Sequence, residues 1–218
     1  MAIKAVLFDL DGTLIDSSEG ITKSAQFALD YYGIEEPDLD KLRKFIGPPL
    51  WESFVKFYDF PKEKALEAVD KFRERYNVTG LFECCLYPGV RECLEELKRR
   101  GYLVAVASSK PEVTCKRILE YHGALELFDS ISGATMDGRI ETKEQVLDQL
   151  FERWPDVSRD EMVLVGDTVF DVKGAGQTGL KCIAVSFGFG NVEEMLDAGA
   201  ICVCDEMMEV VDVVENLG

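Results

Sequence analysis

The chain has 218 residues, enough for one full domain and a smaller accessory one, and 47% of them are hydrophobic. Its formal net charge of −17, from 24 Lys and Arg against 41 Asp and Glu, argues against nucleic acids and anionic membranes as partners. Seven cysteines without a Cys-x-x-Cys pair, an N-terminus without a leader pattern and the lack of an apolar run near about 20 residues predict a cytoplasmic, reducing location.

The first element is an apolar run from Ile3 to Phe8, which predicts a strand buried on both faces. Asp9 and Asp11 follow where this run stops, and strand alternation puts both side chains on the same side. Two converging carboxylates repel each other, so a cation or a proton between them would explain the pair. For a bare Asp-x-Asp, an ordinary strand exit with acidic turn residues is the commoner explanation.

The next segment predicts helices without strands. A first helix is expected from Asp16 to Gly33, because apolar residues recur there at helical spacing. Further helices are expected over Leu39–Phe45, Leu50–Tyr58 and Lys62–Tyr76. Gly47-Pro48-Pro49 cannot continue a helix and makes a rigid loop among them. Residues 17–85 are therefore expected to form a small helical domain inserted between residues 1–16 and 86–218.

Amphipathic helices then alternate with short apolar runs. The helices are expected over Pro88–Arg100, Pro111–Tyr121 and Lys143–Phe151. The strands are expected over Tyr102–Ala107, Phe128–Ser132, Met162–Val165, Lys181–Val185 and Ala200–Cys204. This alternation predicts an α/β fold, a doubly wound parallel sheet with right-handed crossovers. Such a sheet binds ligands at the C-terminal ends of its strands.

Two of the later strand ends carry polar residues. Ser108 comes shortly before Pro111, whose helix start has free N–H groups that can hold an anion. Asp167 and Asp171 lie at a strand-to-helix turn, four residues apart. Helix capping alone also explains a serine or an aspartate in such places.

The run from Asp9 to Thr13 after an apolar strand resembles motif I of the haloacid dehalogenase-like (HAD) superfamily, and the chain is most similar to its phosphoglycolate phosphatase-like branch. The resemblance covers essentially the whole chain. It implies a Rossmann-like HAD core with an inserted helical cap domain. It also implies that Asp9 is a nucleophile and Asp11 a general acid and base.

The resemblance extends to three further motifs. Ser108 matches the phosphate-binding serine or threonine of motif II, and we expect Ser109 and Gly12 to bind substrate beside it. Motif IV is matched by Asp167 and Asp171. The family then implies a Mg²⁺ ion bound by Asp9, Asp11 through its carbonyl, and Asp167, with Asp171 helping to position it.

The lysine of motif III has two candidates. Lys143 lies at a helix start between the third and fourth strands, where the family places it and where the helix dipole disfavours a cation. It lacks the following proline that many members have. Lys110, two residues after Ser108, is the rival, and we favour Lys143.

These roles imply a Mg²⁺-dependent phosphatase that hydrolyses small phosphate monoesters, phosphoglycolate or nucleotide-like, through an aspartyl-phosphate. Its partner would be a small phosphorylated metabolite, and the expected state is a monomer or small homo-oligomer. Asp11 argues against a dehalogenase or a phosphonate hydrolase, which typically lack it. A sugar-phosphate mutase of the β-phosphoglucomutase type and a non-catalytic phosphate-binding regulator are the alternatives. Arg43 and Lys44 in the cap are expected to contact the leaving group.

Overall fold

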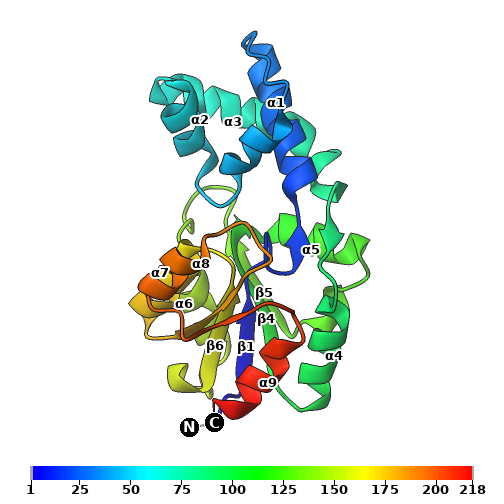
Figure 1. The fold of residues 1–218 in the computed structure, drawn as a ribbon, viewed down its shortest axis with the longest axis vertical. Helices are drawn as coiled ribbons and strands as arrows, with labels where there is room; N and C mark the ends of the chain where they lie inside the picture. Colours follow the sequence, from blue (N-terminus) through cyan, green and yellow to red (C-terminus); the bar gives the residue numbers. More distant parts are fainter. Residues whose placement is uncertain (1, 218) are drawn as a thin grey trace. The chain divides into compact units, whose positions relative to one another are not determined.

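A computed structural model describes residues 2–217 of the chain (Figure 1). The chain divides into two compact units, one formed by the residues up to Ile15 together with Leu86 onward, and one by Asp16–Cys85. Within residues 2–217, no helix has the length and apolar character needed to cross a membrane. None of the seven cysteines forms a disulfide bond.

The larger unit is built on a six-stranded parallel sheet with the strand order β5-β4-β1-β6-β7-β8. These strands are β1 (Ala5–Phe8), β4 (Leu103–Pro111), β5 (Ser130–Ala134), β6 (Met162–Gly166), β7 (Lys181–Val185) and β8 (Cys202–Cys204). The order reverses between β1 and β6, so the predicted doubly wound α/β fold is confirmed.

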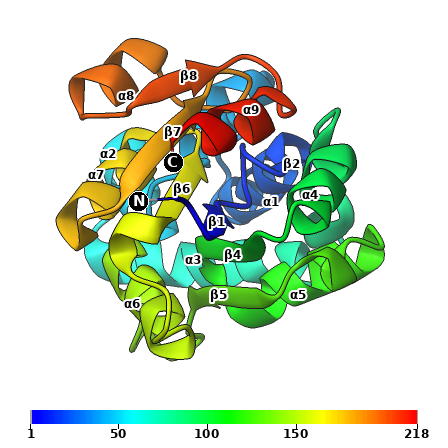
Figure 2. The same cartoon turned by 90° about the horizontal axis from the view of Figure 1, so that it is seen from below.

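Helices cover both faces of this sheet (Figure 2). They are α4 (Val90–Arg99), α5 (Glu112–Tyr121), α6 (Lys143–Arg153), α7 (Val169–Thr178), α8 (Val192–Asp197) and α9 (Glu209–Asn216). Helices α6, α7 and α8 lie on one face, and α4, α5 and α9 lie on the other (Figure 2). The central strands are therefore buried on both faces, which explains why β1 reads as a continuous apolar run.

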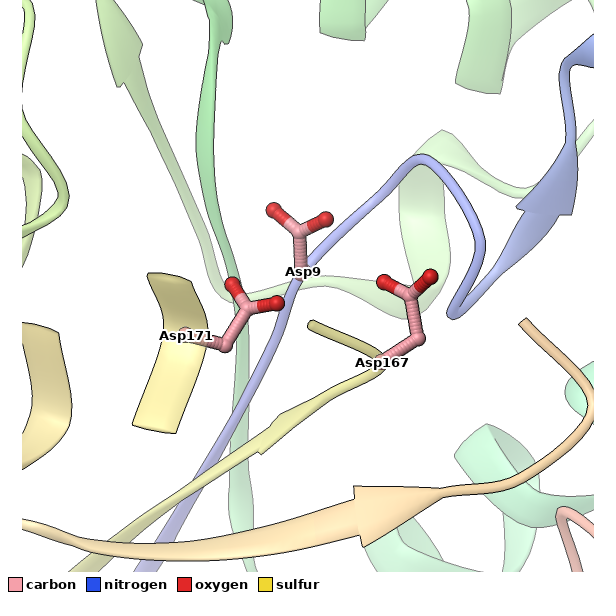
Figure 3. A group of neighbouring side chains, drawn as sticks. All are labelled: Asp9, Asp167 and Asp171. Carbon is pink, nitrogen blue, oxygen red and sulfur yellow. The ribbon is translucent and has the colours of Figure 1, made fainter. Parts of the chain in front are cut away.

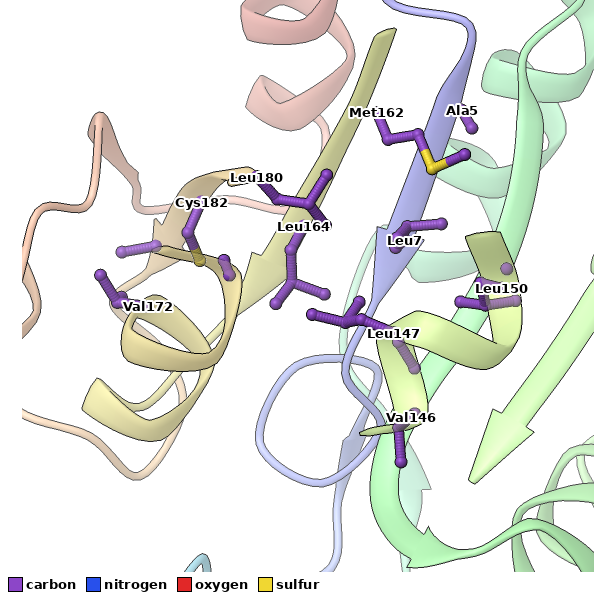
Figure 4. Close-up of a cluster of buried hydrophobic side chains, with 14 of the residues drawn as sticks. Ala5, Leu7, Val146, Leu147, Leu150, Met162, Leu164, Val172, Leu180 and Cys182 are labelled. Atoms are coloured by element: carbon purple, nitrogen blue, oxygen red, sulfur yellow. The ribbon is translucent and has the colours of Figure 1, made fainter. Parts of the chain in front are cut away.

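The core on the first of these faces packs α6 and α7 against β1 and β6 (Figure 4). Leu7 and Leu164 from the strands are fully buried, as are Leu147 and Leu150 from α6. Burying an aliphatic side chain of this size contributes about 1.5–3 kcal/mol. This packing fixes α6 beside the sheet, and Lys143 is the first residue of that helix.

The smaller unit is helical, with α1 (Ser18–Tyr31), α2 (Leu50–Tyr58) and α3 (Lys62–Tyr76). The segment Leu39–Phe45 is a 3₁₀ helix rather than the expected α-helix. Asp38 caps it through a hydrogen bond from the Asp40 amide, and the Ile46 amide bonds the Arg43 carbonyl three residues back. A second, two-stranded sheet pairs β2 (Ile15–Asp16) with β3 (Cys85–Leu86), where the chain passes from one unit to the other.

Several expected boundaries were wrong. Strand β4 continues to Pro111 instead of ending at Ala107, because Ser108 and Pro111 still pair with β5 across an irregularity in the register. The expected strand at Phe128 begins at Ser130, after a 3₁₀ turn over Leu125–Leu127. The last strand is shorter than expected, and α8, α9 and the two-stranded sheet were not anticipated.

Candidate active site

The sheet brings three of the predicted site residues to neighbouring strand ends. Phe8, the last residue of β1, pairs with Val106 of β4 and with Val165 of β6. Asp9 follows β1, Ser108 lies two residues beyond Val106, and Asp167 follows β6 directly. Because all three strands run parallel, these side chains gather at one edge of the sheet, on either side of the point where the strand order reverses.

Asp9, Asp167 and Asp171 form a compact cluster of carboxylates. Each offers one oxygen, and these oxygens all lie within 4.8 Å of one another. Figure 3 shows the three side chains next to one another on separate segments of the chain. Their residues are 8%, 0% and 2% exposed, respectively, so water does little to screen their mutual repulsion. The cluster is therefore unstable unless positive charge is close.

Lys143 supplies part of that charge. Its Nζ lies 2.6 Å from Asp9 Oδ1 and 2.8 Å from Asp171 Oδ1, and it donates a hydrogen bond to the Ala107 carbonyl at 2.7 Å. Burial alone disfavours the charged ammonium, but the carboxylates of Asp171 and Asp9 outweigh it, and the pKa of Lys143 is raised. Lys143 is thus held as a cation between two members of the cluster.

The charge of Lys143 does not fully compensate the cluster. Burial raises the pKa of Asp9 to about 6, since the opposing effect of Lys143 is smaller and Asp171 adds repulsion. Burial, followed by Asp171 and Asp9, raises the pKa of Asp167 well above its usual value. Two hydrogen bonds onto Asp167, from the Phe189 amide at 2.8 Å and the Thr13 hydroxyl at 3.3 Å, act in the opposite direction.

Asp171 has both carboxylate oxygens engaged. Its Oδ2 accepts from the Thr168 amide at 3.0 Å, which is one bond of a capping box at the start of α7, and from the Thr168 hydroxyl at 2.7 Å. Its Oδ1 faces Lys143. Asp171 therefore caps α7 with one oxygen and orients Lys143 with the other. Its predicted part in metal binding stays a prediction.

Asp11 is not one of the three clustered carboxylates and has its own partner. The ammonium of Lys110 is 2.7 Å from Asp11 Oδ1, and the two side chains are 9% and 17% exposed. The two candidate lysines thus contact different aspartates. Lys143 lies between Asp9 and Asp171, whereas Lys110 is paired with Asp11, and the motif III role of Lys143 stays a prediction.

The predicted phosphate-binding residues differ in exposure. Ser108 is buried, and its hydroxyl oxygen accepts a hydrogen bond from the Lys110 amide at 3.3 Å. Ser109 is exposed. Gly12 has φ +82°, and a Cβ there would lie 2.0 Å from Asp167 Oδ2, so only glycine lets this loop approach Asp167. Roles of all three toward substrate stay predictions.

Glycines that pack against the site were not anticipated. Gly188 and Gly190 lie against Asp167, and a Cβ on either would meet atoms of that residue at 2.3 Å or less. A Cβ on Gly174 of α7 would lie 2.6 Å from Cγ and 2.7 Å from Cβ of Lys143. The Gly-x-Gly spacing of residues 188 and 190 after β7 was the available sequence signal. Gly174 had none, because its requirement arises only when α6 and α7 pack together.

The predicted substrate contacts in the helical unit have their own surroundings. Lys44 Nζ lies 4.7 Å from the Phe57 ring centroid and 4.9 Å from that of Tyr58, within cation–π range. Arg43 is exposed at the end of the 3₁₀ helix. Their predicted contact with the leaving group stays a prediction.

The site residues fit a divalent cation. Asp9, Asp11, Asp167 and Asp171 carry four negative charges when ionised, and Lys110 and Lys143 offset two of them. The remaining charge corresponds to one divalent ion. Carboxylate oxygens with few protein ligands suit Mg²⁺, which keeps several of its waters.

Comparison with known proteins places the chain in a family. A family model described as haloacid dehalogenase-like hydrolase matches residues 6–185. The chain is 40% identical over 211 residues to a 5'-nucleotidase of Pseudomonas aeruginosa, covering 97% of the chain and 95% of that protein. It is 33% identical to tyrosine-protein kinase PtkA of Mycobacterium tuberculosis, covering 98% and 72%, and 28% identical to a phosphoglycolate phosphatase of Vibrio parahaemolyticus, covering 97% and 96%.

Solved structures agree with this placement. The crystal structure of a predicted phosphatase from Clostridium acetobutylicum superposes with a TM-score of 0.93 at 40% identity, covering 98% of this chain and 99% of that one. The chain therefore belongs to the haloacid dehalogenase-like hydrolase family. The predicted family, fold and enzyme class, a phosphoric monoester hydrolase, are confirmed.

The packing of α7 against Lys143 gives a stability prediction. Gly174→Ala should lower the free energy of unfolding by about 1–3 kcal/mol, because the new methyl overlaps atoms next to the Lys143 backbone, which cannot swing away. Urea denaturation measures the change. Gly176→Ala on the same helix is the matched control, since a Cβ there meets nothing within 4 Å. It should raise stability by about 0.5–1 kcal/mol, and equal effects at the two positions would contradict the close contact.

Proposed function

We propose that this enzyme hydrolyses small phosphate monoesters, nucleoside 5'-monophosphates first among them, with Mg²⁺ and through an aspartyl-phosphate on Asp9. The observation that carries the proposal is the cluster of Asp9, Asp167 and Asp171, buried, with Lys143 between two of them. A nucleophilic carboxylate that must meet an anionic phosphoryl group needs nearby positive charge, and Lys143 is held as a cation there.

The two steps divide between two aspartates. In the first, Asp9 attacks phosphorus and Asp11 gives a proton to the departing alkoxide oxygen. In the second, Asp11 takes a proton from the water that attacks the phosphorus of the aspartyl-phosphate, and the Asp9 carboxylate and inorganic phosphate are released. Ser108 and Lys143 are assigned to the transferring phosphoryl oxygens.

Mg²⁺ would be held by Asp9, Asp167 and the Asp11 carbonyl, and Asp171 would help to position it. A bound ion would neutralise part of the negative charge on the carboxylates and the phosphoryl oxygens. The helical unit is assigned the cap role of the family, and Arg43 and Lys44 within it are assigned to the leaving group. The site needs no partner beyond a small phosphorylated metabolite, and we expect a cytoplasmic enzyme.

Asp9→Asn should lower kcat by at least about 10³-fold while leaving the fold intact, because it removes the attacking oxygen and almost no volume. Release of inorganic phosphate and a thermal unfolding curve are the two measurements. Asp160→Asn, at an exposed aspartate, is the control and should behave as the wild type. Turnover by Asp9→Asn within about tenfold of the wild type would exclude the covalent mechanism.

Metal binding is tested by thermal unfolding without any substrate. Millimolar Mg²⁺ should raise the Tm of the wild type by several degrees, because binding at about 100 times Kd stabilises by about 2.7 kcal/mol, and 1 kcal/mol moves Tm by about 2–4 °C. Asp167→Asn should lose this shift. In EDTA its Tm should equal or exceed that of the wild type, since it removes one of the repelling buried charges. A full Mg²⁺ shift in Asp167→Asn would remove this residue from the metal site.

Substrate choice is tested with a panel of phosphate esters. We expect kcat/KM to be higher for nucleoside 5'-monophosphates than for phosphoglycolate, because the chain is 40% identical to a 5'-nucleotidase but 28% identical to a phosphoglycolate phosphatase. Released inorganic phosphate is the readout, and a mutase acting on sugar phosphates would not release it. A preference for phosphoglycolate would move the assignment to that substrate.

A further inference from the structure

The pair formed by Lys110 and Asp11 is not explained by the phosphoryl-binding groups assigned above. Its Nζ–Oδ1 distance is 2.7 Å, and the side chains are 9% and 17% exposed. Withdrawing a lysine and an aspartate from water costs several kcal/mol per ion before the attraction between them is counted. The attraction between the two ions need not exceed this cost, so net stability is a weak reason for this partly buried pair.

The backbone at Lys110 is held in place from several sides. Strand β4 pairs with β5 through Ser108 and again through Pro111, and the register shifts between them. Such irregularities re-aim side chains near active sites. The Lys110 amide donates to Ser108 Oγ at 3.3 Å. On the other side, a Cβ at Gly133 would lie 2.6 Å from the Lys110 carbonyl oxygen, so β5 approaches this residue closely.

We propose that Lys110 is a positioning residue for Asp11, holding Oδ1 so that Oδ2 is the oxygen that exchanges protons with leaving group and water. The inference rests on the proposed function, in which Asp11 is the general acid and base. A carboxyl group has two oxygens that can carry the proton and rotates between them. An ammonium at 2.7 Å from one oxygen leaves no acceptor for a proton on that side.

The proton balance of both steps follows from this arrangement. As the bond from phosphorus to the leaving oxygen breaks, that oxygen takes the proton from Oδ2, and Asp11 becomes a carboxylate beside the Lys110 ammonium. In the second step the attacking water gives a proton to Oδ2 as its oxygen bonds to phosphorus and the bond to Asp9 breaks. Lys110 keeps its own protons throughout, so its charge is the same in both steps.

The test compares two substrates that need the acid to different degrees. An alkyl ester such as a nucleoside 5'-monophosphate leaves as an alkoxide that requires a proton, whereas p-nitrophenolate leaves without one. Lys110→Met should lower kcat/KM for the alkyl ester by about 10–100-fold and that for p-nitrophenyl phosphate by less than about threefold. Lys110→Arg keeps the positive charge on a side chain of different length and shape. It should recover part of the kcat/KM for the alkyl ester.

Controls separate the possible outcomes. Lys116→Met removes a lysine on α5 that pairs with Glu112 and is 51% exposed. It should leave kcat/KM for both substrates unchanged. Equal losses on both substrates after Lys110→Met, with weaker inhibition by inorganic phosphate, would mean that Lys110 binds the phosphoryl group and would overturn the proposal. Unchanged kinetics would overturn it as well. Thermal unfolding checks the fold, and if Lys110→Met is unfolded, Lys110→Arg must still show the larger loss on the alkyl ester.

Asp11→Asn distinguishes failure of this inference from failure of the proposed function. It should show the same preferential loss on the alkyl ester, and a larger one than Lys110→Met. If Asp11→Asn hydrolyses the alkyl ester normally, the acid role of Asp11 is wrong whatever Lys110 does. If Asp11→Asn behaves as expected but Lys110→Met does not, only the positioning role is lost.

Discussion

The repulsion among the buried carboxylates of Asp9, Asp167 and Asp171 is the constraint on which the rest of the site depends. Two like charges about 4 Å apart repel by about 4 kcal/mol at the effective dielectric constant of a protein site. A fold brings three together only with a compensating cation or by protonating some of them. Lys143 provides such a cation, from a helix anchored by Leu147 and Leu150 in the core, so the packing of α6 determines the electrostatics of the strand ends.

The same constraint sets the demand for small residues around the cluster. Asp167 accepts one hydrogen bond from the Phe189 amide and one from the Thr13 hydroxyl, and side chains at Gly12 or Gly188 would overlap Asp167. Gly174 likewise leaves room for the Cβ and Cγ atoms of Lys143, which a side chain at position 174 would overlap. Close approach of backbone is thus how this sheet edge stabilises charge without opening it to water, since amide dipoles are fixed and need no reorganisation.

How far the sequence predicted this arrangement depends on the range of the interactions involved. The apolar run before Asp9 and the later strand exits are local signals, and they located Asp9, Ser108, Asp167 and the fold class. The choice between the lysines was open because it depends on which carboxylate each one reaches, a contact across 134 residues for Lys143 and 99 for Lys110. The continuation of β4 was missed for the same reason, because pairing with β5 outweighs the turn signal in Ser108 to Pro111.

The formal charge of −17 and the chemistry of an anionic substrate are compatible because the two act over different distances. Exposed charges further than about 10 Å apart are largely screened at ordinary ionic strength, so the acidic surface contributes little at the strand ends. There the relevant balance is between four aspartates and two lysines, each lysine bonded to its own carboxylate partners. Each lysine already contacts a carboxylate before substrate arrives, so any effect that it has on the reaction is coupled to an aspartate. That coupling makes the two lysines chemically distinct, although both carry the same charge at the same edge of the sheet.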